Sequence, residues 1–340
     1  MRTAPGRSAL AVLAVLVALV LACRAPRAAT SDLPRKVTAV MLPFLTFAPL
    51  IIADERGFFR RHGLEVEWVR LQRSPESLPA LTDGRIDVGA GGLSAGLANV
   101  VARGAPIRIV ANKGTIPESG CTAALSMVGR RGVGPLPGSL RGARVSVQPM
   151  LFNEMFLDRL LDRNGIARDA VHRVDLPAGA IHEALQKGLV DFAVTSEPRV
   201  AQGRAQGTIG PVVEGAEALP GFDHGFILFG PNLLTRDPEA GRRFLMAYLE
   251  GTRAYQEGKT PENVRALARA TGVEEPLLEA TCWMPVREGL AVDLDSIRQF
   301  LDWTRERGAL EGSVSAEQLV DLAPLRAAAA ALGPAARAAR

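Results

Sequence analysis

The pattern of apolar and polar positions in residues 80–90 recurs in residues 184–194. Ala, Leu, Gly and Asp stand at the same spacing in both segments, and the apolar positions between them match. Each copy is typical of the end of a helix, a glycine in the left-handed conformation and then a buried strand. The chain therefore contains an internal repeat that includes a helix–strand junction.

The repeat extends upstream of both junctions, where strand-like and helix-like segments follow in the same order. The matching segments are 36–40 with 144–147, 62–64 with 164–166, and 65–71 with 171–176. The pattern predicts strand–helix–strand–helix–strand twice, and hence two α/β lobes built from one chain. Two similar lobes leave a cleft between them, which is the geometry of a clamp that closes on a small ligand.

Within this frame the pattern predicts the positions of individual elements. Strands are expected at 37–42, 65–71, 86–90, 107–111, 122–128, 144–147, 191–195 and 225–229. Helices are expected from Pro49 towards Gly63, before Gly84 with Ser74 or Ser77 as cap, from Gly91, Gly92 and Ser94 through 101, and at 152–165, 180–187, 239–257, 261–271, 274–281 and 296–307.

These elements predict a discontinuous first lobe at 36–113 and 225–320 and a second lobe at 114–224. Segment 113–120 is expected to connect the first lobe to the second, and segment 219–224 is expected to return to the first lobe. The helices after residue 237 are expected to pack on the first lobe. The Ala/Arg-rich tail at 321–340 is expected to fray.

The N-terminal residues predict export. Two arginines precede an apolar run that is too short for a comfortable transmembrane helix, so 1–22 is interpreted as a signal peptide. The run ends Val-Leu-Ala-Cys, which resembles a bacterial lipobox and predicts cleavage before Cys23 and lipidation of its sulfur. Residues 23–35 would then be a tether. A secretory peptide cut after Ala29 and an uncleaved anchor remain as alternatives.

Composition narrows the classes of function. A hydrophobic fraction of 47% suffices for two buried cores, and a formal net charge of +4 without a basic block carrying aromatics makes nucleic-acid binding unexpected. Besides Cys23 the chain has Cys121 and Cys282, which either pair in an oxidising compartment or remain buried thiols. No CxxC, HExxH or His/Cys cluster occurs, so neither a metal site nor a cofactor is expected.

Residues 47–67 read Phe-Ala-Pro-Leu-Ile-Ile-Ala-Asp-Glu-Arg-Gly-Phe-Phe-Arg-Arg-His-Gly-Leu-Glu-Val-Glu. Residues 81–92, 104–106 before a strand, 140–142 before a strand and the Glu197-Pro198 pair follow in order. This succession resembles the NMT1/THI5-like substrate-binding proteins of ABC importers, which include binders of aliphatic sulfonates, taurine, nitrate and the thiamine pyrimidine precursor. The resemblance runs from Lys36 to about residue 255.

The resemblance implies a type II periplasmic-binding-protein fold, with two α/β lobes joined by a two-strand hinge. It implies a monomeric, non-enzymatic protein in the periplasm or at the cell surface, and the lipobox at Cys23 predicts that a lipid anchors it to the membrane. The ligand would bind between the lobes at the carboxyl ends of strands. It would then be delivered to an ABC permease and its ATPase, which are separate chains.

Candidate ligand-binding residues follow from this geometry and from helix starts that face the cleft. They are Thr46, Phe47, Gly92, Leu93, Ser94 and Lys113 in the first lobe, Gln148, Phe152, Asn153 and Glu197 in the second, and His224 at the return hinge. Each has a structural alternative. Phe47 could fill a core, Lys113 could be a solvated lysine, and Ser94 and Glu197 could serve only their helices. His224 could touch only the hinge backbone.

The second lobe departs from the family pattern at one position. Gly and Ser/Thr are common after its first strand in the sulfonate and nitrate binders, whereas residues 148–153 here read Gln-Pro-Met-Leu-Phe-Asn. This wall is bulkier and more apolar, and Pro149 removes an N–H. We therefore expect a ligand that is organic and partly apolar or heterocyclic rather than a bare inorganic anion.

An enzyme and a ligand-sensing domain are the alternatives to a solute-binding transport protein. Residues 92–96 spell G-x-S-x-G, the nucleophile elbow of serine hydrolases, with Ser94 as nucleophile and Asp223 and His224 as arbitrary partners. Pyrimidine synthases on this fold use a Cys-rich motif that this sequence lacks. A ligand-sensing domain on the same fold differs from a transport protein mainly in its genomic neighbours.

Overall fold

The first sheet of the computed structural model, which describes residues 34–42, 44–120 and 125–333, has the strand order β2-β1-β3-β10-β4. Its strands are β1 (Arg35–Met41), β2 (Leu64–Arg70), β3 (Val88–Gly92), β4 (Arg108–Thr115) and β10 (Asp223–Phe229). β1 pairs in parallel with β2 and β3, and β10 runs antiparallel between β3 and β4.

The second sheet has the order β7-β6-β8-β5-β9 and repeats the arrangement of the first. Its strands are β5 (Ser126–Arg130), β6 (Arg144–Ser146), β7 (His172–Val174), β8 (Phe192–Thr195) and β9 (Ile209–Glu214). β6 pairs in parallel with β7 and β8, and β5 is antiparallel to β8 and β9. The internal repeat of the sequence is therefore confirmed as a repeat of sheet topology.

The helix–strand junctions that revealed the repeat have the expected backbone. Gly84 follows α4 (Leu78–Thr82) with φ 74°, and Gly188 follows α7 (Ile181–Gln186) with φ 65°. A residue with a Cβ is disfavoured at such angles, so glycine ends both helices and lets the chain turn into β3 and β8.

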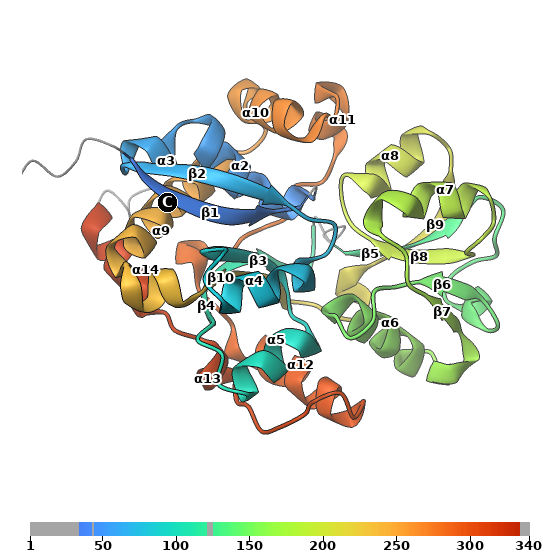
Figure 1. Ribbon diagram of the computed structural model, residues 1–340. Helices are drawn as coiled ribbons and strands as arrows, with labels where there is room; N and C mark the ends of the chain where they lie inside the picture. Colours follow the sequence, from blue (N-terminus) through green and yellow to red (C-terminus); the bar gives the residue numbers. More distant parts are fainter. Residues whose placement is uncertain (1–33, 43, 121–124, 334–340) are drawn as a thin grey trace, which may run out of the picture. The chain divides into compact units, whose positions relative to one another are not determined.

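The helices divide between the two sheets (Figure 1). We call the first sheet with its helices the first lobe, and the second sheet with α6, α7 and α8 the second lobe. First-lobe helices are α2 (Ala48–Glu55), α3 (Phe58–Arg61), α4, α5 (Ala95–Ala102), α9 (Pro238–Gln256), α10 (Pro261–Thr271), α11 (Glu275–Ala280), α12 (Leu294–Glu306), α13 (Ala316–Leu319) and α14 (Ala323–Leu332). Second-lobe helices are α6 (Phe152–Arg163), α7 and α8 (Arg199–Ala205).

The chain passes from β4 to β5 and returns from β9 to β10, within residues 35–340, which form one compact unit. The expected crossing segments were too long, because β4 continues to Thr115 and β10 already begins at Asp223. Lys113 and His224 are therefore strand residues that pair within the first sheet. Three other interpretations of local structure also need correction.

The helix expected from Pro49 is divided into α2 and α3, because Gly57 adopts φ 71° between them. Neither Ser74 nor Ser77 caps α4, and the Ser77 hydroxyl donates to the Ser74 carbonyl instead. The tail does not fray throughout, since α14 packs on α9 with Leu325 and Ala328 buried.

Cys282 is disulfide-bonded, which excludes the alternative of a free thiol at this position. Cys121 and Cys23, the other two cysteines of the sequence, lie outside the described residues, as does the predicted signal peptide.

Candidate ligand pocket

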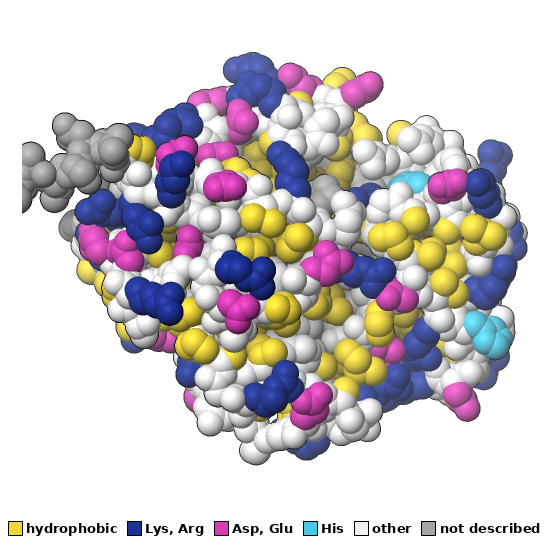
Figure 2. All heavy atoms as spheres, viewed as in Figure 1, with side chains coloured by type: hydrophobic (Ala, Val, Ile, Leu, Met, Phe, Trp, Pro, Cys, Tyr) yellow, Lys and Arg dark blue, Asp and Glu magenta, His cyan; other side chains and the backbone are white. Residues whose placement is uncertain are grey.

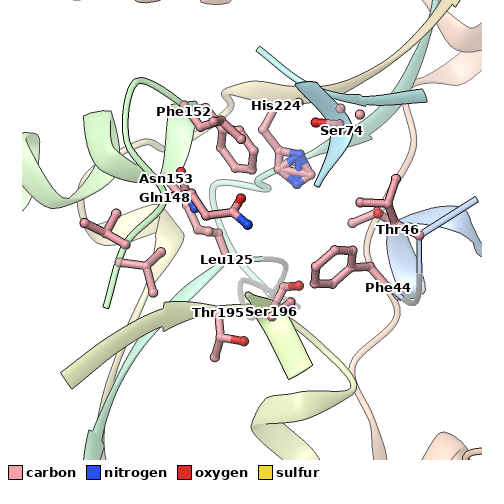
Figure 3. A pocket seen from close by; sticks show the side chains of 18 of the residues that line it. Phe44, Thr46, Ser74, Leu125, Gln148, Phe152, Asn153, Thr195, Ser196 and His224 are labelled. Atoms are coloured by element: carbon pink, nitrogen blue, oxygen red, sulfur yellow. The ribbon is translucent and has the colours of Figure 1, made fainter. Parts of the chain in front are cut away.

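A pocket opens between the two lobes and contains about 810 Å³ of empty space, including its mouth. Figure 3 shows side chains from both lobes pointing towards this space. The first lobe contributes loops that follow β1 and β2, together with residues of β3, β4 and β10. The second contributes residues that follow β6 and β8. First-lobe lining residues include Phe44, Thr46, Phe47, Gln72, Ser74, Gly92, Lys113 and His224, and second-lobe ones include Leu125, Gln148, Phe152, Asn153, Ile181, Val194, Thr195 and Ser196.

Eight of the eleven candidate residues from the sequence line this pocket, namely Thr46, Phe47, Gly92, Lys113, Gln148, Phe152, Asn153 and His224. Leu93, Ser94 and Glu197 are not among its lining residues. The pocket brings the eight together because the carboxyl ends of β1, β3, β4 and β6 and the amino end of the antiparallel β10 face the same space. Open α/β sheets place ligands at the carboxyl ends of their strands.

Ser94 serves the helix that follows it. Its side chain is buried, and its hydroxyl accepts a hydrogen bond from the Leu97 amide at 3.1 Å, which caps α5. Leu93 is also buried, and its carbonyl accepts from the amide of Phe152 at 3.1 Å. These two residues therefore support the pocket from behind and hold the second lobe's α6 entry against the first lobe.

The serine-hydrolase arrangement is not formed by the described residues. Asp223 accepts from Thr115 and Arg287, while the Nδ1 atom of His224 has no hydrogen-bond partner. Ser94 is hydrogen-bonded to a backbone amide as a helix cap. A nucleophile, its base and an orienting acid should form a hydrogen-bonded chain, and these three residues do not.

Glu197 lies at the start of α8, where one carboxylate oxygen accepts from the Ala201 amide at 2.9 Å. Burial raises the pKa of this carboxyl. Its carbonyl oxygen accepts from the Leu45 amide of the first lobe at 3.3 Å. Its placement matches the alternative of a helix-start glutamate, with an additional backbone contact between the lobes.

Lys113 is 2% exposed, so the alternative of a solvated surface lysine is wrong. Its Nζ donates to the carbonyl and hydroxyl oxygens of Thr46, at 3.3 and 3.1 Å. It also lies 4.0 Å from the centre of the Phe47 ring, which is within cation–π range. Burial lowers the pKa of the Lys113 ammonium to about 7. Phe47 is itself 1% exposed, so it fills the core and lines the pocket at once.

His224 faces Phe152 across the lobes, with ring centres 4.9 Å apart (Figure 3). Burial, together with the nearby Lys113 charge, lowers the pKa of His224 to about 3, so the imidazole is neutral at physiological pH. Its Nδ1 has no hydrogen-bond partner among the described residues. A buried polar atom without a partner is costly, and this one belongs to a pocket-lining side chain that a ligand could satisfy.

Residues 148–153, which form the second-lobe wall of the pocket, are held in place by a hydrogen bond and by close packing on the first lobe. Met150 adopts φ 54°, and its amide donates to Glu154 at 2.7 Å. Phe152 packs so closely on the first lobe that a Cβ at Gly92 would lie 2.3 Å from its ring. The absence of a side chain at Gly92 is therefore required for the approach of the two lobes.

Some residues that line the pocket were not predicted from the sequence. Thr195 and Ser196 end β8, and Phe44 follows β1, so the rule that ligands bind at carboxyl strand ends could have found them. The hydroxyl of Thr195 is buried and has no hydrogen-bond partner in the part of the chain that the structure describes. Leu125 and Ile181 carry no such signal, because they reach the pocket only through the packing of the second lobe.

The electrostatic character of the pocket is set by one residue. Among the described residues that line it, Lys113 is the one with a charged side chain, and none is Asp or Glu. The other lining side chains are apolar or are neutral hydrogen-bonding groups. In contrast, Figure 2 shows Lys and Arg side chains interspersed with Asp and Glu over one face of the molecule.

Across the described ranges, no three His, Cys, Asp or Glu side chains gather as they would around a metal ion. No helix in this part of the chain combines the length and the apolar character needed to cross a bilayer.

A family model described as "NMT1/THI5 like" matches residues 45–263. A search of curated proteins by sequence finds no match. The match to the family model covers the strands and helices that build most of the pocket.

Solved structures of low sequence identity share the fold. The periplasmic nitrate-binding protein NrtA from Synechocystis PCC 6803 aligns with a TM-score of 0.73 at 16% identity, covering 88% of this chain and 90% of that chain. The alkanesulfonate-binding protein SsuA from Xanthomonas axonopodis pv. citri, bound to MOPS, aligns with a TM-score of 0.67 at 17% identity, covering 87% and 98%. The desulfurization enzyme DSZB aligns with a TM-score of 0.64 at 15% identity, covering 88% and 99%. The expected periplasmic-binding-protein fold is confirmed.

Proposed function

Because the chain belongs to the NMT1/THI5-like family, we propose that it is an exported solute-binding protein that captures a small organic ligand between its lobes and delivers it to an ABC importer. The observation that carries the proposal is the pocket itself, which is lined from both lobes at the carboxyl ends of strands. Two fold neighbours are proteins that bind nitrate and alkanesulfonate, although a third is an enzyme.

The lining supports an organic ligand rather than a bare inorganic anion. Phe44, Leu125 and Ile181 present apolar surface that a bare anion would leave uncovered. Gln148 and Asn153 add neutral amide groups that can orient a heterocycle or a polar substituent. A pocket of mainly apolar side chains with a few polar groups is typical of sites for small organic molecules.

A thermal-shift screen tests binding and names the class of ligand. The panel holds sulfonates, taurine, nitrate, pyrimidines, riboflavin and aromatic acids. A ligand that binds only the folded state raises the melting temperature by mass action. We expect an organic class to give the largest shift. Equal or larger shifts with nitrate would refute the organic preference, and no shift for any class would count against the solute-binding function.

Export and delivery are further parts of this proposal. The N-terminal apolar run and Cys23 support a lipid-anchored protein in the periplasm or at the cell surface, acting as a monomer beside a permease and an ATPase. Mass spectrometry of the membrane-extracted protein should show a diacylglyceryl group on Cys23, and Cys23→Ala should release the protein from the membrane. Uptake of the bound compound into membrane vesicles of the host should depend on ATP and on the added protein.

A further inference from the structure

Among the described residues, the partners of the buried Lys113 ammonium are neutral. Its Nζ is hydrogen-bonded to two oxygens of Thr46 and lies over the Phe47 ring. Buried charges in proteins are normally paired with an opposite charge, because neutral groups compensate only part of the lost hydration. Thr46 and Phe47 replace water around the Lys113 ammonium without balancing its charge. A position for an anion is therefore open beside Nζ, on the side that faces the pocket.

The charged groups on the elements around Lys113 do not fill that position. On β10, Asp223 is turned away, since its carboxylate accepts from Thr115, Arg287 and the Asp293 amide. Arg287, in the segment that packs against β4, is bound to the same carboxylate. His224 faces Lys113 and is neutral, because burial and the Lys113 charge lower its pKa to about 3. Among the described residues, no acidic side chain reaches the Lys113 ammonium.

The apolar part of the pocket lining disfavours a small hydrated anion as the natural partner of Lys113. Phe44 and Phe152 contribute rings, and Val194 and Ile181 contribute aliphatic surface. Water next to this surface is released when an apolar body covers it. The combination of one unpaired cation and an apolar wall fits a molecule with one anionic group on an apolar frame.

We propose that Lys113 determines specificity in the binding function proposed above: the site selects an organic anion over its neutral isostere, and the Lys113 amine takes up a proton from solvent as the anion binds. Without a ligand, burial favours the neutral amine. An anion placed against Nζ favours the ammonium and reverses this effect. Carboxylate and sulfonate groups share this chemistry, and the experiment below separates them.

The test uses isosteric pairs on the purified protein, benzoate with benzamide and benzenesulfonate with benzenesulfonamide, by titration calorimetry at pH 8. Running each titration in phosphate and in Tris gives the number of protons taken up, because the two buffers differ in ionisation enthalpy. We expect at least one anion to bind about tenfold or more tightly than its neutral partner. We expect uptake of about one proton per anion bound.

Two substitutions separate charge from proton uptake. Lys113→Met should abolish both the anion preference and the proton uptake. Lys113→Arg places a guanidinium group, which is always protonated, at this position. This variant should keep the anion preference and lose the proton uptake. Lys187→Met is the matched control, because Lys187 is exposed, pairs with Glu183 and does not line the pocket.

Each result of these titrations either supports or overturns the inference about Lys113. Equal affinity for anions and neutral isosteres, or an anion preference that survives in Lys113→Met, would overturn the inference and leave the solute-binding function standing. Binding of neutral compounds alone would do the same. If neither these pairs nor any class in the thermal-shift panel bound, both the inference and the proposed function would fail.

Discussion

At the scale of single residues, Lys113 is expected to destabilise the ligand-free protein. Burial lowers the pKa of its ammonium from 10.5 to about 7. Between pH 7 and pH 10.5 the unfolded chain binds more protons at Lys113 than the folded chain does. The destabilisation by Lys113 therefore decreases, and the free energy of unfolding rises, as the pH increases from 7 towards 10. Below pH 7 the penalty is complete, at about 1.4 kcal/mol for each unit of pKa shift.

Lys113→Met should therefore increase the free energy of unfolding at pH 7 by a few kcal/mol, measured by urea denaturation without ligand. The gain over the native protein should shrink as the pH approaches 10. A gain that does not change with pH would contradict the assignment to the ammonium. Lys187→Met, which removes an exposed lysine, should show neither the gain nor its pH dependence.

The sequence could place Lys113 at the cleft but could not show its burial. Its position near a strand end was readable from the apolar run before it, whereas its partners Thr46 and Phe47 come from a segment far away in the chain. A lone lysine after a strand is more often solvated. The same limit applies to His224, whose neutrality depends on burial and on Lys113 together.

At the scale of elements, Ser94 is expected to matter as the N-cap of α5. Ser94→Ala removes the acceptor for the Leu97 amide and should lower the free energy of unfolding by about 1 kcal/mol. It should leave ligand affinity nearly unchanged, because Ser94 does not line the pocket. A fluorophosphonate probe should fail to label Ser94 in the native protein. Labelling would revive the hydrolase alternative.

The entry to α6 depends on two buried carboxylates. Glu154 accepts from the Met150 amide and pairs with Arg173 at 3.0 Å and Arg307 at 3.3 Å, while Asp158 accepts from the Trp303 indole at 2.9 Å. Because Arg307 follows α12 of the first lobe, this network joins the lobes behind the pocket wall.

Glu154→Ala should lower the free energy of unfolding by about 3–5 kcal/mol, because it removes the acceptor of the Met150 amide and one of the two buried carboxylates that Arg173 and Arg307 share with Asp158. Glu183→Ala, which breaks an exposed pair on α7, should cost at most about 0.5 kcal/mol. Equal losses in the two variants, measured by urea denaturation, would contradict the role of the buried network.

The elements that the sequence predicted best are those with a regular apolar pattern and a positive-φ glycine near one end, such as α6 before Gly165, β2 after Gly63 and β8 after Gly188. β9 was missed, because its Gly210-Pro211 pair interrupts the apolar pattern. Proline is tolerated there since β9 is at the edge of the second sheet. The extra residues of β4 and β10 were missed because their pairing with each other, rather than local propensity, continues both strands.

At the scale of the whole molecule, the repeat was sufficient to predict two lobes and a cleft between them. It could not predict how the lobes meet, because the residues that touch across the lobes are not equivalent positions of the repeat. One such contact is an ion pair of 2.6 Å between Arg73 of the first lobe and Asp175 of the second. Both residues are partly exposed, at 28% and 41% of their side chains, so this contact can form and break at low cost.

If the pocket closes on its ligand, this ion pair should contribute to the closed state. Arg73→Ala should then weaken ligand affinity by up to about fivefold, the limit for an exposed ion pair, with the effect reduced at high salt. Saturating ligand should reduce the radius of gyration in solution scattering, since closure brings the lobes together, and Arg73→Ala should require more ligand for the same reduction. Arg85→Ala, whose exposed pair with Asp83 stays within the first lobe, serves as control. A radius that does not change with ligand would show that binding occurs without closure, and the Arg73–Asp175 pair would then be a fixed surface contact.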